Sequence, residues 1–294
     1  CRTAAIAYYR QMLHEFVQQF AVDDQDGVRD PVGLFGGKLE AHLHVVTAQT
    51  SMLQSWRKVL NHAGLEVQAL LLPGVATSCA VLSEMDRDLG AIVVDIGGVH
   101  TDIVCCVDGA IRETMAVPWG GDRLTERLAE RFHLPLAAAE QVKLQCNSVE
   151  PSSEDGDPLR VPTGPGASRT VPRAEVVALL AEEVQALLSE VRQRLEASRY
   201  FREAASGLVM TGGTALMTGV LERAETACNL PVRLGGLHGV TAHPRVTLPP
   251  TAATAIGLLA YQLAARPKAR AGSATEHPLS RFVSRAKALL EDYF

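Results

Sequence analysis

The chain has 294 residues, of which 47% are hydrophobic and 21% charged, with a formal net charge of −5 at pH 7. This composition excludes a disordered chain and gives enough length for two core-containing lobes. The negative charge excludes a general attraction to nucleic acid. The sequence contains no uninterrupted run of about 18 apolar residues, so it predicts no membrane-spanning helix.

The six cysteines stand at positions 1, 79, 105, 106, 146 and 228, and none has C-x-x-C spacing. That spacing argues against a zinc site or a disulfide framework. We therefore predict buried free thiols in a reducing cytoplasm.

The first fifty residues predict β-structure around a turn-rich segment. Residues 1–20 fit either an amphipathic helix or a strand in their last part, and 23–37 is rich in Asp, Gly and Pro. The run 38–47 alternates apolar and polar residues, which predicts a half-exposed strand. His42 and His44 share a face of this strand, but no third ligand completes a metal site, so we interpret them as solvated.

Strands and helices then alternate as in an α/β lobe. The patterns predict a helix over 51–63, a buried strand over 67–72 and a second helix over 76–88.

The segment 91–102, AIVVDIGGVHTD, is an apolar strand that ends in an acidic residue and a glycine pair. A second strand and an Asp-Gly turn at 108–109 predict a hairpin. Because Gly97 and Gly98 carry no Cβ, the loop can turn backbone N–H groups toward an anion such as phosphate. A similar strand followed by Thr-Gly-Gly recurs at 208–219.

Between these two segments, Gly120 and Gly121 lead into a helix for which Asp122 is the predicted N-cap. The helix over 136–145 carries Glu140 and Lys143 one turn apart. The residues alone leave two interpretations open, a surface ion pair or a ligand-binding pair.

The second half of the chain is predominantly helical. We predict a long loop over 147–172 and a long amphipathic helix over 173–198, with Glu183 on its exposed side. A helix, a short strand and an apolar helix follow at 221–228, 231–235 and 251–265.

The last residues predict a linker over 266–278 and an amphipathic helix over 279–294. Six basic residues and one acidic residue lie between 266 and 287, which favours binding to an anionic membrane surface. The alternative is that this helix folds back on the globular part. The predicted membrane contacts are Leu279, Phe282, Val283, Arg285, Lys287, Leu290 and Phe294.

The two Gly-rich segments with a Glu-x-x-Lys between them resemble the FtsA family of actin-like ATPases. DGVRDPVGLFGGKLEAHLHVVTA near the start and LSRFVSRAKALLEDYF at the end are also similar to that family. The resemblance implies an α/β, actin-like (ribonuclease H-like) two-lobe fold that binds ATP with Mg²⁺, the metal being held through water and not by direct ligands. The implied ATP-binding residues are Asp95, Gly97, Gly98, Thr101, Asp102, Gly120, Gly121, Glu140, Lys143, Gly212, Gly213 and Thr214.

The resemblance also implies a division of the chain into subdomains. Because the chain opens without Met and within a periodic pattern, we expect an incomplete first lobe that lacks the first phosphate loop. The implied parts are a remnant of the inserted subdomain 1C (1–50), part of subdomain 1A (51–94), subdomain 2A (95–122 and 207–250), subdomain 2B (123–206), an interlobe helix (251–264), the linker (265–278) and the membrane-targeting helix (279–294).

The implied function is that of a peripheral membrane tether on the cytoplasmic face of the inner membrane at the division septum. It would anchor FtsZ filaments through the FtsZ C-terminal tail, recruit later division proteins and self-associate into polymers. Arg169 and Arg173 are candidate contacts for the FtsZ tail. ATP would chiefly set conformation. Val99 and His100 stand where the family has Gly and Thr, so we expect no measurable turnover from this chain.

Two alternatives belong to the same superfamily. One is a sugar-kinase or chaperone-type ATPase, and the other is an actin-like adaptor of pilus assembly. Neither requires the terminal amphipathic helix, which therefore distinguishes them from a membrane tether.

Overall fold

A computed structural model describes residues 6–152, 156–164, 167–238 and 248–265. The chain divides into two compact units, residues 1–261 and 262–294. The predicted linker and the predicted membrane-binding helix lie outside the described residues, so they stay predictions.

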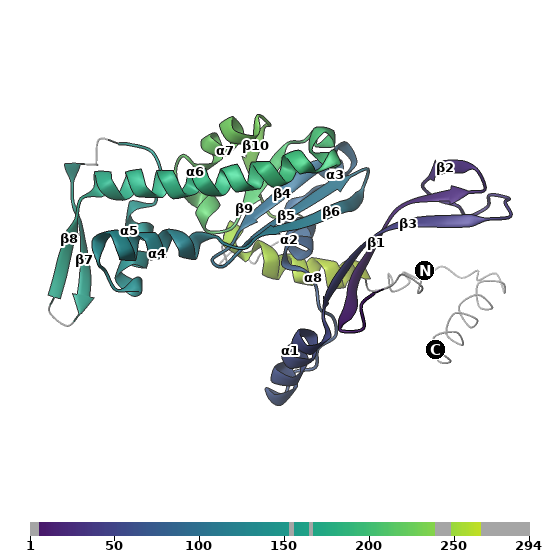
Figure 1. Ribbon diagram of the computed structural model, residues 1–294, viewed down its shortest axis with the longest axis horizontal. Coiled ribbons are helices and arrows are strands. Elements are labelled where there is room, and N and C mark those ends of the chain that lie inside the picture. The colour runs from purple at the N-terminus through teal and green to yellow at the C-terminus, as the bar shows by residue number, and fades with distance from the viewer. Residues whose placement is uncertain (1–5, 153–155, 165–166, 239–247, 266–294) are drawn as a thin grey trace, which may run out of the picture. The chain divides into compact units, whose positions relative to one another are not determined.

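The main body is built on a five-stranded sheet with the order β10-β9-β4-β5-β6 (Figure 1). Strands β4 (Ala91–Ile96), β5 (Thr101–Val107) and β6 (Ala110–Val117) are antiparallel neighbours. Strands β9 (Leu208–Thr211) and β10 (Val232–Leu234) run parallel to β4. The strands predicted around both Gly-rich segments are thus confirmed, and they lie side by side in one sheet.

Helices cover both faces of this sheet. On one face, Ile92, Val94 and Ile103 pack in a core with α4 (Gly121–Phe132), α5 (Leu136–Cys146), α6 (Arg173–Ala197) and α7 (Val220–Cys228). On the other face, Val93 and Val104 pack in a core with α2 (Pro73–Val81) and α8 (Ala253–Ala265). A Cβ at Gly257 would lie 1.7 Å from the carbonyl oxygen of Ala76, so α8 approaches α2 closely because residue 257 is glycine.

A second, three-stranded sheet precedes the main body. Its order is β2-β1-β3, and the central strand β1 (Arg10–Val22) is antiparallel to both β2 (Gln25–Val28) and β3 (Leu39–Gln49). The pairing of β1 with β3 resolves the first segment as a strand and not a helix. Helix α1 (Thr50–His62) follows where it was predicted.

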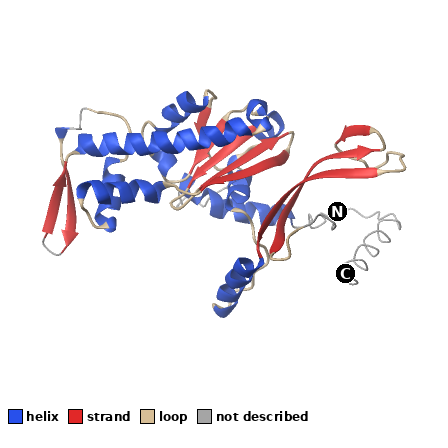
Figure 2. Ribbon diagram, viewed as in Figure 1, coloured by secondary structure: helices blue, strands red, loops and turns tan. Residues whose placement is uncertain are grey.

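Three predictions of secondary structure were wrong. No strand forms over 67–72, and this segment belongs to none of the described sheets. The helix predicted over 76–88 is two helices, α2 and α3 (Glu84–Leu89), since Ser83 caps the second with its side chain. The predicted loop over 147–172 contains the hairpin of β7 (Leu159–Gly164) and β8 (Ala167–Val171), which Figure 2 shows apart from the other sheets.

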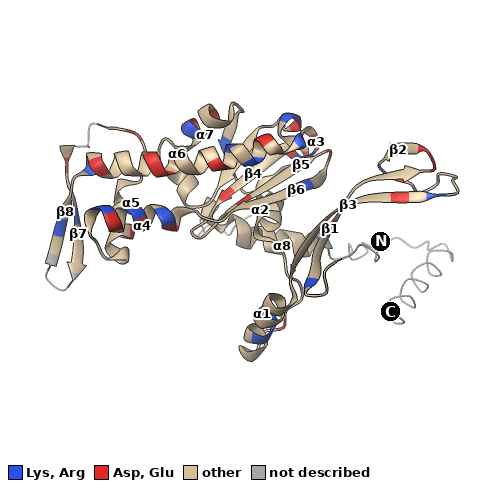
Figure 3. Cartoon of the chain, in the orientation of Figure 1, with Lys and Arg blue, Asp and Glu red and all other residues tan. Residues whose placement is uncertain are grey.

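Glu183 was predicted on the exposed side of its helix, but its side chain is only 6% exposed. Its carboxylate lies 3.2 Å from Arg123 Nε and 2.7 Å from Arg127 Nε of α4. Figure 3 shows charged residues of both signs along α4 and α6. The ion pairs between these helices supply the partners that a buried carboxylate requires.

The cysteine and histidine predictions are confirmed in part. Cys105, Cys106 and Cys228 are buried free thiols, and burial raises the pKa of Cys105 and of Cys106 to about 12. His42 is exposed as predicted, whereas His44 is partly buried, with Nε2 3.0 Å from Thr114 Oγ1. Across the described ranges, no group of three metal-binding side chains is present and no helix has the length and hydropathy to span a membrane.

Candidate functional site

A cavity of about 180 Å³ lies beside the loops that follow β4 and β9, next to α4 and α5. Seven residues from the predicted ATP-binding set line it. They are Gly97, Gly98, Gly121, Glu140, Lys143, Gly213 and Thr214. Residues from separated parts of the sequence therefore meet at one place.

The loop after β4 is tied to the first turn of α4. The carbonyl oxygens of Gly97 and Gly98 accept hydrogen bonds from Gly121 N and Asp122 N, each at 2.9 Å. Within the described chain, the N–H groups of Gly98 and Val99 make no hydrogen bond. The loop therefore keeps backbone donors for an anion.

Two glycines at the start of α4 permit its close approach to the loops after β4 and β9. A Cβ at Gly120 would lie 2.3 Å from Gly97 O, and one at Gly121 would lie 2.9 Å from Thr214 Oγ1. Gly120 is the N-cap of α4, so the prediction of Asp122 as N-cap was wrong. Asp122 is the second residue of the helix, two positions after the N-cap, and it also lines the cavity.

Lys143 and Glu140 form part of a hydrogen-bonded network, in which the Lys143 side chain is 10% exposed and the Glu140 side chain is 41% exposed. Lys143 Nζ lies 2.7 Å from Glu140 Oε2, and it donates to Gly121 O at 3.0 Å and to Thr125 Oγ1 at 2.8 Å. The Thr125 hydroxyl in turn donates to Glu140. Burial alone would raise the pKa of Glu140, but the hydrogen bonds from Lys143 and Thr125 and the Lys143 charge outweigh it and lower that pKa.

The loop after β9 holds two neighbouring glycines with different roles. Gly212 has φ of +90°, and a Cβ there would lie 2.2 Å from the carbonyl oxygen of Ile96. Gly213 would place a Cβ in open space, with no atom within 4 Å, and it lines the cavity. Gly212 therefore serves the packing of β9 against β4, whereas Gly213 borders the site.

Two predicted acidic residues do not line the cavity and stand at paired positions of β4 and β5. Asp95 accepts hydrogen bonds from Thr77 of α2 at 2.8 Å and from Thr254 of α8 at 3.1 Å. Asp102 is 6% exposed, with Oδ2 3.1 Å from His100 Nε2. Burial raises the pKa of Asp102; the nearby Asp95 charge adds to this rise and His100 opposes it.

The remaining predicted residues do not reach the cavity directly. Thr101 is buried and its hydroxyl donates to the carbonyl of Trp119 at 3.1 Å. Arg169 Nη1 donates to the His133 carbonyl at 3.0 Å, and Arg173 is the first residue of α6. Both arginines lie away from the cavity lining, on the hairpin and helix that follow α5.

Sequence reasoning missed several residues that line the cavity, among them Leu144, Asn147 and Met217. Leu144 is 64% exposed, so it offers an apolar surface at this site. Asn147 ends α5 with φ of 44°, and an Asn directly after a helical run is a signal for such a C-cap. No comparable signal marks Leu144 or Met217.

Comparison with known proteins gives the family. A family profile described as cell division protein FtsA matches residues 92–257, and a profile described as the SHS2 domain inserted in FtsA matches residues 1–47. The chain belongs to the FtsA family. Its predicted resemblance is thus confirmed, and this membership indicates a division-related, actin-like role.

Curated FtsA relatives agree over most of the chain. Cell division protein FtsA of Pseudomonas aeruginosa is 34% identical over 264 residues, covering 89% of this chain and 63% of the relative. FtsA of Neisseria meningitidis is 35% identical, covering 85% and 61%, and FtsA of Escherichia coli K12 is 33% identical, covering 85% and 62%. This FtsA-family chain therefore spans less than two thirds of the length of these relatives.

Solved structures confirm the actin-like α/β fold. MreB5 of Spiroplasma citri bound to ADP has a TM-score of 0.60 and 14% identity, covering 74% of this chain and 66% of that chain. The PilM-PilN type IV pilus biogenesis complex has a TM-score of 0.61 and 18% identity, covering 89% and 68%. The MamK double helical filament has a TM-score of 0.54 and 18% identity, covering 75% and 66%.

Proposed function

We propose that this FtsA-family chain is an actin-like adaptor of the bacterial division ring that binds a nucleotide in the cavity beside β4 and β9. The observation that carries this proposal is the convergence of seven family-implied residues, from four separate segments, on one cavity. The adaptor would anchor FtsZ filaments to the inner membrane and recruit later division proteins. It would act as a peripheral protein on the cytoplasmic face at the septum.

The residues at the cavity fit a nucleotide. The backbone N–H groups of Gly98 and Val99 are available for phosphate oxygens, and Gly213 leaves open space on the opposite wall. Glu140 and Lys143 would lie near the adenosine, as the family resemblance implies. The cavity volume of about 180 Å³ is below the roughly 300–1,000 Å³ of pockets that enclose a whole ligand, so these residues would hold part of ATP.

Mg²⁺ would neutralise phosphate charge when bound with ATP. Asp95 and Asp102 are the carboxylates that would hold it. They would do so through water and not directly, because neither lines the cavity. Their side chains already bond Thr77, Thr254 and His100, which fixes their orientation.

We expect the nucleotide to set conformation and not to be turned over. Val99 is 70% exposed in the loop where the family has glycine, and its side chain restricts that backbone. Phosphate release by the purified chain should not exceed that of a buffer control. A clear rate that Lys143→Met abolishes would contradict this part of the proposal.

Self-association into actin-like polymers is part of the proposal. The MamK structure with the same fold is a filament, and the fold of this chain would permit a similar stacking of subunits. Arg169 and Arg173 remain the proposed contacts for the FtsZ tail. The exposed Arg160 of β7, which bonds Ser168, is a matched control for Arg169→Glu.

Flotation with vesicles tests the adaptor directly. The folded chain is mixed with vesicles of phosphatidylglycerol and phosphatidylethanolamine and a labelled FtsZ C-terminal peptide. We expect the peptide to rise with the vesicles only when the chain is present. Leu290→Glu should release the chain, whereas Ser284→Glu, which adds the same charge on the predicted polar side, should not.

The outcomes separate the parts of the proposal. If the chain rises without the peptide, the FtsZ contact is wrong and the membrane contact stands. If Leu290→Glu still floats, the terminal helix is not the anchor. If a folded chain does not rise at all, the tether function is wrong.

A further inference from the structure

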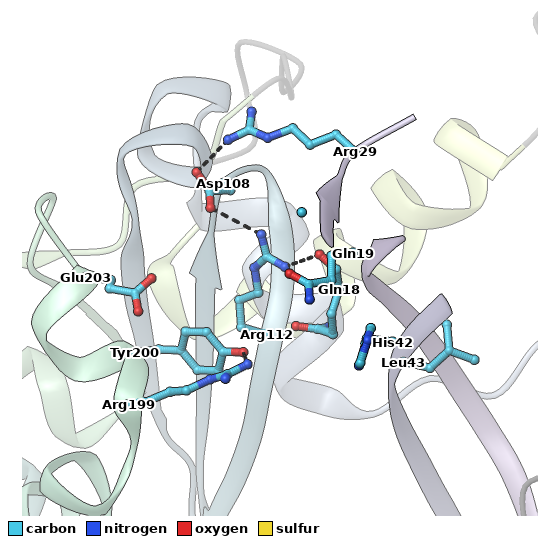
Figure 4. A pocket seen from close by; sticks show the side chains of 11 residues that line it. Gln18, Gln19, Arg29, His42, Leu43, Asp108, Arg112, Arg199, Tyr200 and Glu203 are labelled. Atoms are coloured by element: carbon cyan, nitrogen blue, oxygen red, sulfur yellow. Dashed lines mark hydrogen bonds and ion pairs between the residues drawn. The ribbon is translucent and has the colours of Figure 1, made fainter. Parts of the chain in front are cut away.

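A second cavity, larger than the candidate nucleotide site, lies outside that site. It measures about 730 Å³ and lies between the three-stranded sheet, the turn that joins β5 to β6, and the 3-10 helix η2 (Arg199–Glu203) (Figure 4). This volume falls within the roughly 300–1,000 Å³ of known ligand sites. Neither the family-implied site residues nor the proposed nucleotide uses it.

The lining is strongly polar. It contains three arginines, Arg29, Arg112 and Arg199, against two carboxylates, Asp108 and Glu203. The pocket therefore carries a formal excess of one positive charge on a chain whose net charge is −5. An anionic group is the complementary ligand.

The arginines differ in the hydrogen bonds and ion pairs that their guanidinium groups form. Arg112 donates to the carbonyls of Val107 and Gln18 and lies 3.3 Å from Asp108, so it is structural. Arg199 is stacked on Tyr200, with its guanidinium carbon 4.6 Å from the ring centroid, and donates to the Tyr200 hydroxyl. In the described chain Arg199 forms no ion pair, so it is available to a ligand carboxylate.

The pocket also offers acceptors without donors. Gln18 Nε2 donates to the carbonyls of Phe16 and Ile111, which fixes the amide orientation. Its Oε1 is buried and has no partner among the described residues. The Glu203 carboxylate on the facing wall likewise makes no ion pair or hydrogen bond in that part of the chain (Figure 4).

We propose that this pocket binds an acidic peptide segment, with Arg199 holding a carboxylate and Gln18 Oε1 accepting a backbone N–H. A peptide supplies both an anionic acceptor for Arg199, which has no ion pair among the described residues, and amide donors for the unpaired Gln18 oxygen. Inorganic phosphate at neutral pH supplies mainly acceptors and leaves the buried Gln18 oxygen unpaired, an arrangement that costs free energy. The peptide is therefore the better match.

Fluorescence anisotropy with the whole chain tests this. The probes are short fluorescein-labelled peptides rich in Asp, each with a matched peptide in which Asn replaces Asp. We expect saturable binding that is stronger for the Asp peptides. Arg199→Ala should weaken it about fivefold, the size expected for a partly exposed charge pair. Glu203→Gln should tighten binding, because it removes a repelling charge.

Arg202→Ala is the matched control, since Arg202 is an exposed arginine of the same helix η2 outside the pocket. Melting curves of each variant check that the fold persists. Equal losses in Arg199→Ala and Arg202→Ala would mean general charge attraction, and equal binding of Asp and Asn peptides would also overturn the proposal.

Two further binding measurements distinguish a peptide ligand from inorganic phosphate. An Asp peptide with N-methylated backbone amides should bind more weakly, because it lacks the donors for Gln18; equal binding would contradict the peptide geometry. If inorganic phosphate binds in an Arg199-dependent way and the peptides do not, the pocket is a phosphate site and the peptide proposal is wrong.

Discussion

The ammonium group of Lys143 lies 2.7 Å from the Glu140 carboxylate and 3.0 Å from the carbonyl of Gly121. The bond to Gly121 joins α5 to the first turn of α4, directly at the cavity. The loop after β4 is bonded to the same turn. One side chain therefore links the two walls of the candidate nucleotide site.

Lys143→Met should weaken nucleotide binding about tenfold, because it removes the cation and releases Gly121 from α5. We expect a stability loss of about 1–2 kcal/mol, since Glu140 is 41% exposed and can regain water. Binding is measured with a fluorescent ATP analogue and stability by chemical denaturation. Lys58→Met, on the exposed surface of α1, removes the same charge and should change neither.

Gly212→Ala should reduce stability, whereas Gly213→Ala should reduce nucleotide binding. The first places a Cβ 2.2 Å from Ile96 O at positive φ, so we expect a loss of roughly 3 kcal/mol in unfolding free energy. The second meets no atom within 4 Å and should leave stability within about 0.5 kcal/mol while weakening nucleotide binding. Thermal melts and nucleotide titrations of both variants check this. Equal stability losses would contradict the assigned roles.

Glu183→Gln should destabilise the pairing of α4 with α6 by about 2 kcal/mol. Breaking a fully buried pair costs more, but the side chains of Arg123 and Arg127 are 43% and 44% exposed and can be solvated. Glu196→Gln, in an exposed pair with Arg192, should cost less than about 0.5 kcal/mol. Urea denaturation of both variants measures the difference, and similar costs would show that the Glu183 ion pairs contribute little.

Asp86→Ala should reduce stability by about 1–2 kcal/mol at pH 7. Burial raises the pKa of Asp86, but hydrogen bonds from Ser83 and the Arg233 contact outweigh it, so the folded pKa lies below the unfolded value. The stabilisation is therefore present above the unfolded pKa of about 3.9 and is lost as the pH falls through the folded pKa. Denaturation at a series of pH values should show the two chains converging at low pH.

Glu84→Ala is the control for that experiment, because Glu84 is exposed in the same turn of α3. It should change stability little and with no such pH dependence. A difference between Asp86→Ala and the unchanged chain that persists at acid pH would mean that packing, and not the carboxylate, is responsible.

The sequence was most informative where local pattern and packing agree. The apolar runs before both Gly-rich segments predicted β4 and β9, and the Asp-Gly turn predicted the β5–β6 hairpin, in which Asp108 and Gly109 both have positive φ. The periodicity of α6 was likewise sufficient. In these elements the local signal and the buried face coincide.

Long-range contacts account for the rest. Glu183 shares a helix surface with exposed residues, and its burial depends on two arginines some sixty positions earlier. The hairpin β7–β8 consists of two short paired strands. Its segment is rich in turn-forming residues, so the sequence predicted a loop there. No local pattern specifies which segments of the chain meet. The grouping of Lys143, Gly121 and Thr214, which line one cavity, could therefore be predicted only from the family resemblance.

The most direct test of the nucleotide site is an equilibrium titration of the folded chain with a fluorescent ATP analogue and Mg²⁺. We predict saturable binding that unlabelled ATP displaces, that Lys143→Met and Gly213→Ala weaken, and that Lys58→Met leaves unchanged. Absence of saturable binding by a folded sample, or binding equal in all four chains, would contradict the assignment of this cavity to a nucleotide.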